Sequence, residues 1–76
     1  MIEYTLPSGE GQMFLIIAGD GTRQWKITCN ATEMIRVYAN TSKCVGSANP
    51  GTSLELSYMG NGLWKVINDT QVILYD

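Results

Sequence analysis

Histidine is absent from this chain of 76 residues, and only two cysteines occur. Without histidine, neither a Ser–His nor a Cys–His nucleophile can form. Cys29 and Cys44 make no Cys-x-x-Cys pair, so the sequence argues against a structural zinc site. A carboxylate pair for glycoside cleavage is the remaining catalytic route, but no two acids share a setting that would raise one pKa. We therefore expect no enzyme, no metal and no cofactor.

Charge and long apolar runs are also scarce. Charged residues make up 16% of the chain, the net charge is −2, and lysine and arginine nowhere cluster. Phosphate binding needs such clusters, so we expect no nucleic-acid partner. The longest apolar run, residues 13–18, is too short to cross a bilayer, so we expect no membrane insertion. Met1 is followed by no basic and apolar leader, which predicts that the chain carries no secretory signal.

The length predicts one domain, residues 1–76, near the lower limit for a stable hydrophobic core. A chain this short buries only roughly 60% of its unfolded surface. Disulfides, metals or association with other chains usually make up the shortfall in small domains. Two explanations of Cys29 and Cys44 stay open, a single disulfide or two free thiols, and a reducing cytosol favours the thiols.

Glycine, proline and asparagine interrupt the chain every eight to twelve residues, which is typical of β-sandwiches and barrels. Alternating polarity favours strands over helices throughout. The pattern predicts a small antiparallel β-sandwich with strands at residues 2–6, 12–18, 24–29, 34–39, 43–45, 53–59, 63–68 and 72–75.

Two turns have the composition of type I′ hairpins, Gly19-Asp20-Gly21 and Gly60-Asn61-Gly62. Each precedes a Trp-Lys-Ile or Trp-Lys-Val segment. The similarity indicates either two sheets related by pseudo-symmetry or convergence on the same turn chemistry. We predict a hairpin at both turns.

Two predicted strands, residues 13–17 and 72–75, are apolar on both faces. In so small a domain, one face can pack inside the chain and the other against a neighbouring copy. We therefore expect an interface between copies that includes five apolar side chains: Met13, Leu15, Ile17, Val72 and Leu74.

Aromatic side chains offer a second kind of site. Trp25, Trp64, Tyr38 and Tyr58 combine apolar faces with polar edges, as a platform for a sugar ring requires. The alternative is that both tryptophans fill the core beside tight turns, which their strand positions favour. Tyr38 and Tyr58 are then the better surface candidates.

Two segments together resemble the C-terminal or receptor-proximal β modules of bacteriophage tail fibres and tailspikes. The first is residues 4–16, with Leu6-Pro7 followed by Gly11-Gln12 and an apolar strand. The second is residues 54–67, with Tyr58, a glycine turn and Trp64 followed by Val66-Ile67. The middle of the chain, residues 30–50, falls outside the pattern.

The resemblance implies the excised end module of a longer fibre protein, made in the host cytoplasm and carried on the virion. It implies that the module forms a homotrimer, which would hold the fibre chains together and take part in host attachment. A bacterial surface polysaccharide would be a further partner. Two other hypotheses stay open: a monomeric carbohydrate-binding module and a small SH3-like barrel that binds peptides. The sugar-binding hypothesis would use Trp25 or Trp64.

Overall fold

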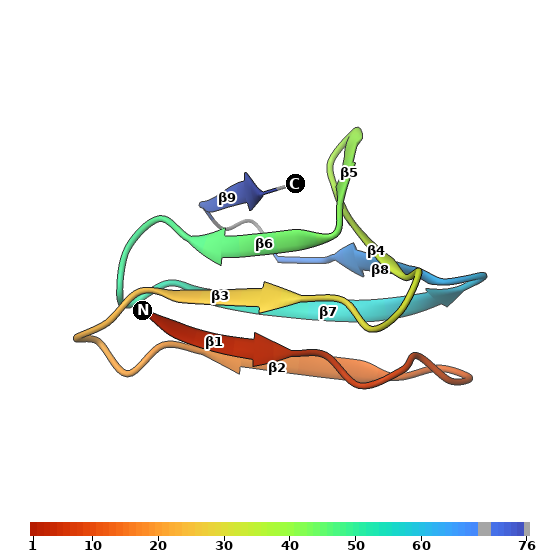
Figure 1. Cartoon of the computed structure of the whole chain (residues 1–76), viewed down its shortest axis with the longest axis horizontal. Coiled ribbons are helices and arrows are strands. Elements are labelled where there is room, and N and C mark those ends of the chain that lie inside the picture. The colour runs from red at the N-terminus through yellow and green to blue at the C-terminus, as the bar shows by residue number, and fades with distance from the viewer. Residues whose placement is uncertain (69–70, 76) are drawn as a thin grey trace.

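Nine β-strands make up the regular structure of the computed structural model, which describes residues 1–68 and 71–75 (Figure 1). All eight predicted strands are present, with ends displaced by no more than two residues. A ninth, β5, was not predicted, because its three polar residues look like a loop. The strands are β1 (Ile2–Thr5), β2 (Phe14–Ala18), β3 (Trp25–Thr28), β4 (Met34–Val37), β5 (Asn40–Ser42), β6 (Cys44–Ser47), β7 (Ser53–Gly60), β8 (Leu63–Val66) and β9 (Val72–Tyr75).

The strands form two sheets that pack face to face, with orders β1-β3-β6-β9 and β2-β7-β8-β4-β5. The predicted all-β sandwich is confirmed, and the two separate sheets differ from the single barrel of the SH3-like hypothesis. Two pairings, β1 with β3 and β4 with β8, are parallel, so the sheets are mixed rather than wholly antiparallel. Strands that follow each other in the chain often lie in opposite sheets. Two strands that pair within one sheet are then not joined by a tight turn, so they can run parallel.

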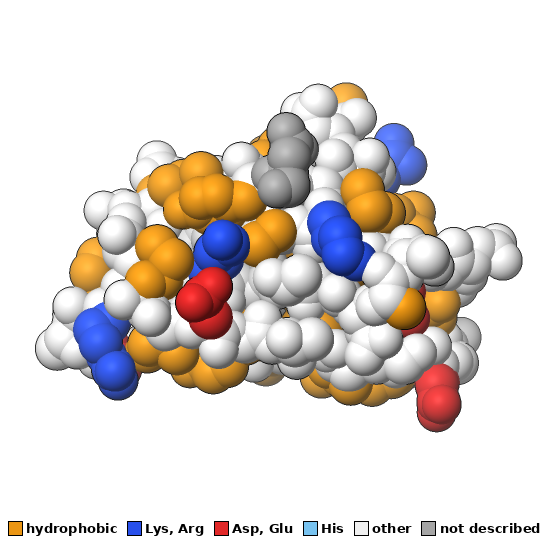
Figure 2. Space-filling view, in the orientation of Figure 1, with side chains coloured by type: hydrophobic (Ala, Val, Ile, Leu, Met, Phe, Trp, Pro, Cys, Tyr) orange, Lys and Arg blue, Asp and Glu red, His pale blue; other side chains and the backbone are white. Residues whose placement is uncertain are grey.

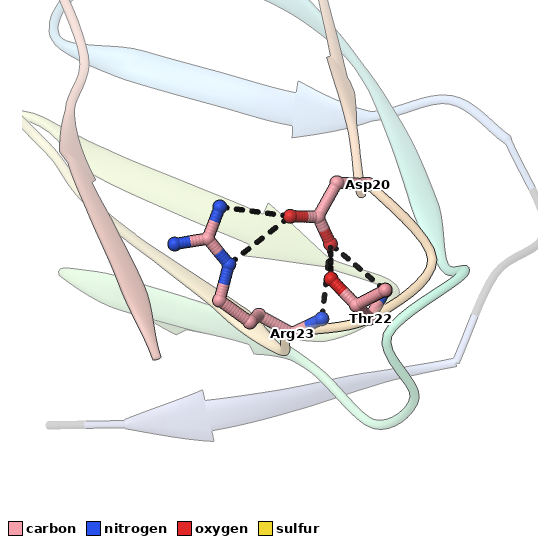
Figure 3. A network of polar contacts seen from close by, with 3 residues as sticks. All are labelled: Asp20, Thr22 and Arg23. Atoms are coloured by element: carbon pink, nitrogen blue, oxygen red, sulfur yellow. Dashed lines mark hydrogen bonds and ion pairs between the residues drawn. The ribbon is translucent and has the colours of Figure 1, made fainter.

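The turn at residues 19–21 is a crossing between sheets, so the prediction of a hairpin there was wrong. β2 pairs with β7, whereas β3 pairs with β1 and β6. The Asp20 carboxylate accepts the backbone N–H groups of Thr22 and Arg23 at 2.8 and 2.9 Å, and it also binds the Arg23 guanidinium (Figure 3). The side chain of Asp20 therefore organises this turn, as aspartate commonly does at bends.

The turn at residues 60–62 forms the predicted hairpin between β7 and β8. Asn61 and Gly62 have φ values of 56° and 76°, the left-handed conformations that a type I′ turn requires. The register shifts between Tyr58 and Gly60, which leaves Met59 as an extra residue in β7. Such a bulge increases the local twist at the end of the strand.

The core lies between the two sheets and draws on both. Cys29 belongs to it, whereas Cys44 lies near the Thr28 hydroxyl, 3.3 Å from Sγ to Oγ1. Adjacent residues of a strand face opposite sides of the sheet. Cys29 therefore faces away from Cys44, which lies opposite Thr28. Both cysteines are buried free thiols, and burial raises the pKa of Cys29 to about 11. The buried hydrophobic cluster is Leu6, Trp25, Ile27, Cys29, Ile35, Val37, Val45, Leu54, Leu56 and Trp64.

β6 is buried along its whole length: Val45 belongs to the core, and the ring of Tyr75 on β9 covers Gly46. A Cβ atom on Gly46 would lie 2.6 Å from the Tyr75 ring, so glycine permits this close contact. On the same face the Lys26 ammonium lies 4.9 Å from the centroid of the Tyr75 ring. Within the chain itself, Val72 packs against the core and Tyr75 packs on β6, so both faces of this apolar strand are partly covered.

Candidate functional site

A buried carboxylate, Glu33, fastens the loop of residues 7–13 to the five-stranded sheet. It accepts the Trp64 indole N–H at 2.9 Å, the Gly9 backbone N–H at 3.1 Å and the Ser8 hydroxyl at 3.1 Å. Glu33 is only 8% exposed. Its pKa lies below the ordinary value, chiefly because the Trp64 indole donates to it, with smaller contributions from Gly9, Ser8 and the charge of Lys43 that oppose the effect of burial.

Tyr58 belongs to the same cluster, and its ring packs against Gly9 of the loop and against Trp64. The ring centroids of Tyr58 and Trp64 are 5.1 Å apart and tilted by 59°. A Cβ atom on Gly9 would lie 2.2 Å from the Tyr58 ring, so only glycine fits there. The Tyr58 hydroxyl accepts the Gly62 N–H at 2.8 Å, which ties the ring to the β7–β8 hairpin.

An open pocket of about 420 Å³ lies between this loop and the ends of β2 and β7. Phe14, which is 50% exposed, and Tyr58 supply aromatic surface, while Gln12 and Ser57 supply neutral polar groups. No charged side chain lines it, so the pocket suits an uncharged ligand. The lining residues are Gly11, Gln12, Met13, Phe14, Ser57, Tyr58, Met59 and Gly60.

The predicted aromatic residues separate into two groups. Trp25 and Trp64 are fully buried, so neither can stack against a ligand, and the sugar platform proposed for them was wrong. Tyr58 is half-buried and lines the pocket. Tyr38 is exposed at the turn between β4 and β5, which projects from the sandwich in Figure 1, and it does not line the pocket.

The residues predicted for an interface between copies mostly face inward. Met13, Leu15, Ile17 and Val72 pack against the core, whereas Leu74 is 39% exposed. The first four therefore contribute to the fold rather than to an outward apolar face, and that part of the prediction was wrong. A strand that is apolar on both faces does not reveal which face is the inner one, because that depends on its register with a neighbour.

Other apolar side chains on or near the five-stranded and four-stranded sheets are left uncovered. Phe14 and Ile16 of β2 are 50% and 61% exposed, Ile73 of β9 is 41% exposed, and Ile67 after β8 is 49% exposed. Figure 2 shows hydrophobic side chains gathered along the edge of the molecule where β1 and β2 lie, and again near β9. The residues predicted on β2 are thus the ones that face the core, whereas on β9 the predicted Leu74 is exposed and Val72 is not.

Within residues 1–68 and 71–75, no three acidic, cysteine or histidine side chains gather as ligands for a metal ion. The same residues contain no helix of the length and apolarity needed to span a membrane. No protein-family model matches the chain, and searches of curated proteins and of solved structures find no match either. Function therefore has to be argued from the pocket and from the uncovered apolar strands.

Proposed function

We propose that this domain is a structural module that assembles as a homotrimer in a bacteriophage tail fibre or tailspike. The proposal combines the resemblance in residues 4–16 and 54–67 with the apolar side chains that the sandwich leaves uncovered. It gives the chain no catalytic role. Its location would be the virion, after synthesis in the host cytoplasm.

The observation that carries the proposal is the exposure of Ile73 and Leu74 on the terminal strand β9. Val72 and Tyr75 of this strand are partly buried, whereas the two residues between them are about two-fifths exposed. Near a three-fold axis the same residues from all three copies can meet, so one short strand suffices for the contact. Burial of these side chains would supply stability that a domain of this size lacks.

Light scattering at low micromolar concentration tests the proposal. We expect a mass that is a multiple of three chains, and the double variant Ile73→Ser and Leu74→Ser should lose the three-fold contact. Met59→Ser is the control, because Met59 is 56% exposed, more than either residue, but lies in the bulge of β7. A wild-type mass of one or two chains would refute the trimer.

We propose glycan attachment as a second role, located at the pocket that Phe14 and Tyr58 line. An exposed aromatic side chain beside neutral amide and hydroxyl groups suits the apolar face and hydroxyls of a sugar ring. The absence of charge in the lining favours a neutral saccharide unit over an acidic one.

Tryptophan fluorescence can report on this pocket, because the Trp64 ring lies against Tyr58. The variant Trp25→Phe leaves Trp64 as the only tryptophan, and glucose or galactose at millimolar concentration is the probe. We expect a saturable change in emission that the further substitution Phe14→Ala removes. A strictly linear response to both sugars would contradict the second role.

A further inference from the structure

The edge strand β2 lacks the features that usually protect a sheet edge. The two sheets have four edge strands, β1, β9, β2 and β5, and β2 is the longest of them. β1 contains Glu3, and β5 is a polar strand of three residues. β2 contains neither a charged residue nor proline, although natural edges commonly use both to prevent pairing with another chain.

Backbone geometry shows which groups of β2 point to the free edge. The Tyr58 N–H donates to the Met13 carbonyl at 2.9 Å, and the register places Leu15 opposite Leu56. In an antiparallel ladder, alternate residues direct both backbone groups at the partner strand. Met13, Leu15 and Ile17 therefore face β7, and the backbone groups of the intervening residues, Phe14, Ile16 and Ala18, face outward from the sheet.

The same three residues also have exposed side chains, with Ile16 at 61%. A strand with free hydrogen-bonding groups and uncovered apolar side chains at the same positions is a template for strand addition. Core-facing residues are not involved, so pairing at this edge needs no rearrangement of the sandwich.

We propose that β2 of a second copy of this chain adds antiparallel to this edge, about a two-fold axis at Ile16. Ile16 then pairs with Ile16 of the second copy, and Phe14 pairs with the small Ala18 of that copy. All three outward-facing residues of each strand exchange their backbone hydrogen bonds in this register. Centring the axis on any other residue of β2 would leave part of this edge unpaired within the strand. An axis at Leu15 would pair Phe14 with Ile16 and leave Ala18 without a partner in β2, and an axis at Ile17 would pair Ile16 with Ala18 and leave Phe14 without one.

The charges on the outer face tolerate this arrangement. Glu55 of β7 lies opposite Ile16 in each copy. The two Glu55 residues are then three strand spacings apart, roughly 14 Å. Since the screening length at physiological ionic strength is about 8 Å, their repulsion is weak. A second copy thus fits the edge in size, hydrogen bonding and charge, and the pairing goes beyond the proposed three-fold contact at β9.

The experiment measures the solution mass of the full chain, wild type and Ile16→Lys. Lysine at this position would place two like charges directly opposite each other across the two-fold axis, which destabilises a strand pair. Ile67→Lys is the matched control, since Ile67 is exposed on the same sheet but lies away from the edge. Far-ultraviolet circular dichroism checks that each variant is folded.

Two contacts of different symmetry give distinct masses. Six chains would support both the β2 pairing and the proposed trimer, whereas two chains would support the pairing and refute the trimer. Three chains would overturn the pairing and leave the trimer standing, and one chain would overturn both. We expect Ile16→Lys to halve the wild-type mass and Ile67→Lys to leave it unchanged.

Amide hydrogen exchange provides an independent readout. In the paired state the amides of Phe14, Ile16 and Ala18 should be as protected as those of Leu15 and Ile17. In Ile16→Lys only the last two should stay protected. A mass of two or six chains with rapidly exchanging amides at 14, 16 and 18 would overturn the β2 pairing and place the contact elsewhere.

Discussion

The strands that carry the two tryptophans are built alike, although the turns that precede them are different. Trp25 on β3 lies opposite Ile2 of the parallel strand β1, and Trp64 on β8 lies opposite Ile35 of the parallel strand β4. Both indoles are fully buried and belong to opposite sheets. The similarity between the two Trp-Lys segments therefore extends to the strands that surround each tryptophan, but it does not extend to the two glycine turns.

The indole N–H groups mark a further difference. Trp25 donates to the backbone carbonyl of Thr52 at 2.8 Å, whereas Trp64 donates to the carboxylate of Glu33 at 2.9 Å. A hydrogen bond to a charged acceptor is stronger than one to a neutral acceptor. The indole of β3 is thus held by a neutral backbone carbonyl of the segment before β7, and the indole of β8 by a buried carboxylate.

The largest expected effect tests whether the two tryptophans are equivalent in packing. Trp25→Ala and Trp64→Ala should each cost about 3–5 kcal/mol, since each removes a fully buried ring and leaves a cavity. Urea unfolding monitored by circular dichroism measures both, with Ile67→Ala as the exposed control. If one substitution cost less than about 1 kcal/mol, that tryptophan would not anchor its sheet.

A smaller effect separates the two turns by their glycines. A Cβ atom on Gly19 would lie 2.1 Å from the Pro50 carbonyl oxygen, whereas one on Gly60 meets nothing within 4 Å. Gly19→Ala should therefore cost about 2–3 kcal/mol through overpacking against backbone. Gly60 has a φ of 88°, so Gly60→Ala should cost about 1–2 kcal/mol through backbone strain alone. The reverse order in thermal unfolding would show that Gly19 and Pro50 are not in close contact.

The central residues of the two turns allow a finer comparison. Asn61 has a left-handed backbone, so Asn61→Ala should cost about 1 kcal/mol, and Asn61→Gly should cost less. Asp20 works through its side chain, so Asp20→Gly should lower the unfolding temperature although glycine is common in turns. Equal changes in unfolding temperature for Asn61→Gly and Asp20→Gly would contradict this difference between a backbone role and a side-chain role.

The smallest effect is a dependence of stability on pH. Hydrogen bonds from the Thr22 and Arg23 backbone, and then the Arg23 side chain, hold the pKa of Asp20 well below its ordinary value. The pKa of Glu33 is also lowered. A carboxyl whose folded pKa is depressed stabilises the fold above its ordinary pKa, and this contribution is lost as the pH falls through the folded pKa.

Urea midpoints measured from about pH 6 down to about pH 3 should therefore decrease, and Asp20→Asn and Glu33→Gln should each flatten the slope. Sodium chloride at about 0.5 M should reduce the part from Asp20, whose ion pair with Arg23 is exposed, more than the part from the buried Glu33. A slope unchanged in both variants would exclude these carboxyls as its source.

Much of the fold was predictable because turn residues and alternating polarity are local signals. The strands at residues 53–59 and 63–68 and the hairpin between them followed from such signals. The partner of β2 was not predictable, since Gly19-Asp20-Gly21 has the composition of a hairpin but Asp20 hydrogen-bonds within the turn. The partner of β2 is set by its pairing with β7, which is distant in the sequence.

The candidate site was less predictable than the fold. Glu33 was not predicted as a site residue, because nothing near it in the chain shows that Trp64 and Gly9 donate hydrogen bonds to it. Its only local sign is its place just before the strand that begins at Met34. Phe14 and Ile16 were recognisable as apolar, but their outward direction depends on the register of β2 with β7.

The connections between the layers have a consequence for how the chain folds. The order β1-β3-β6-β9 gathers strands that are far apart in the chain, and among the described strands only the hairpins β4–β5 and β7–β8 pair neighbours in sequence. Domains dominated by such distant pairings fold in milliseconds to seconds rather than microseconds, because loop closure precedes most of the energetic gain. During synthesis the four-stranded sheet cannot be completed until β9 leaves the ribosome, so the domain acquires its final structure only after its ninth strand has been made.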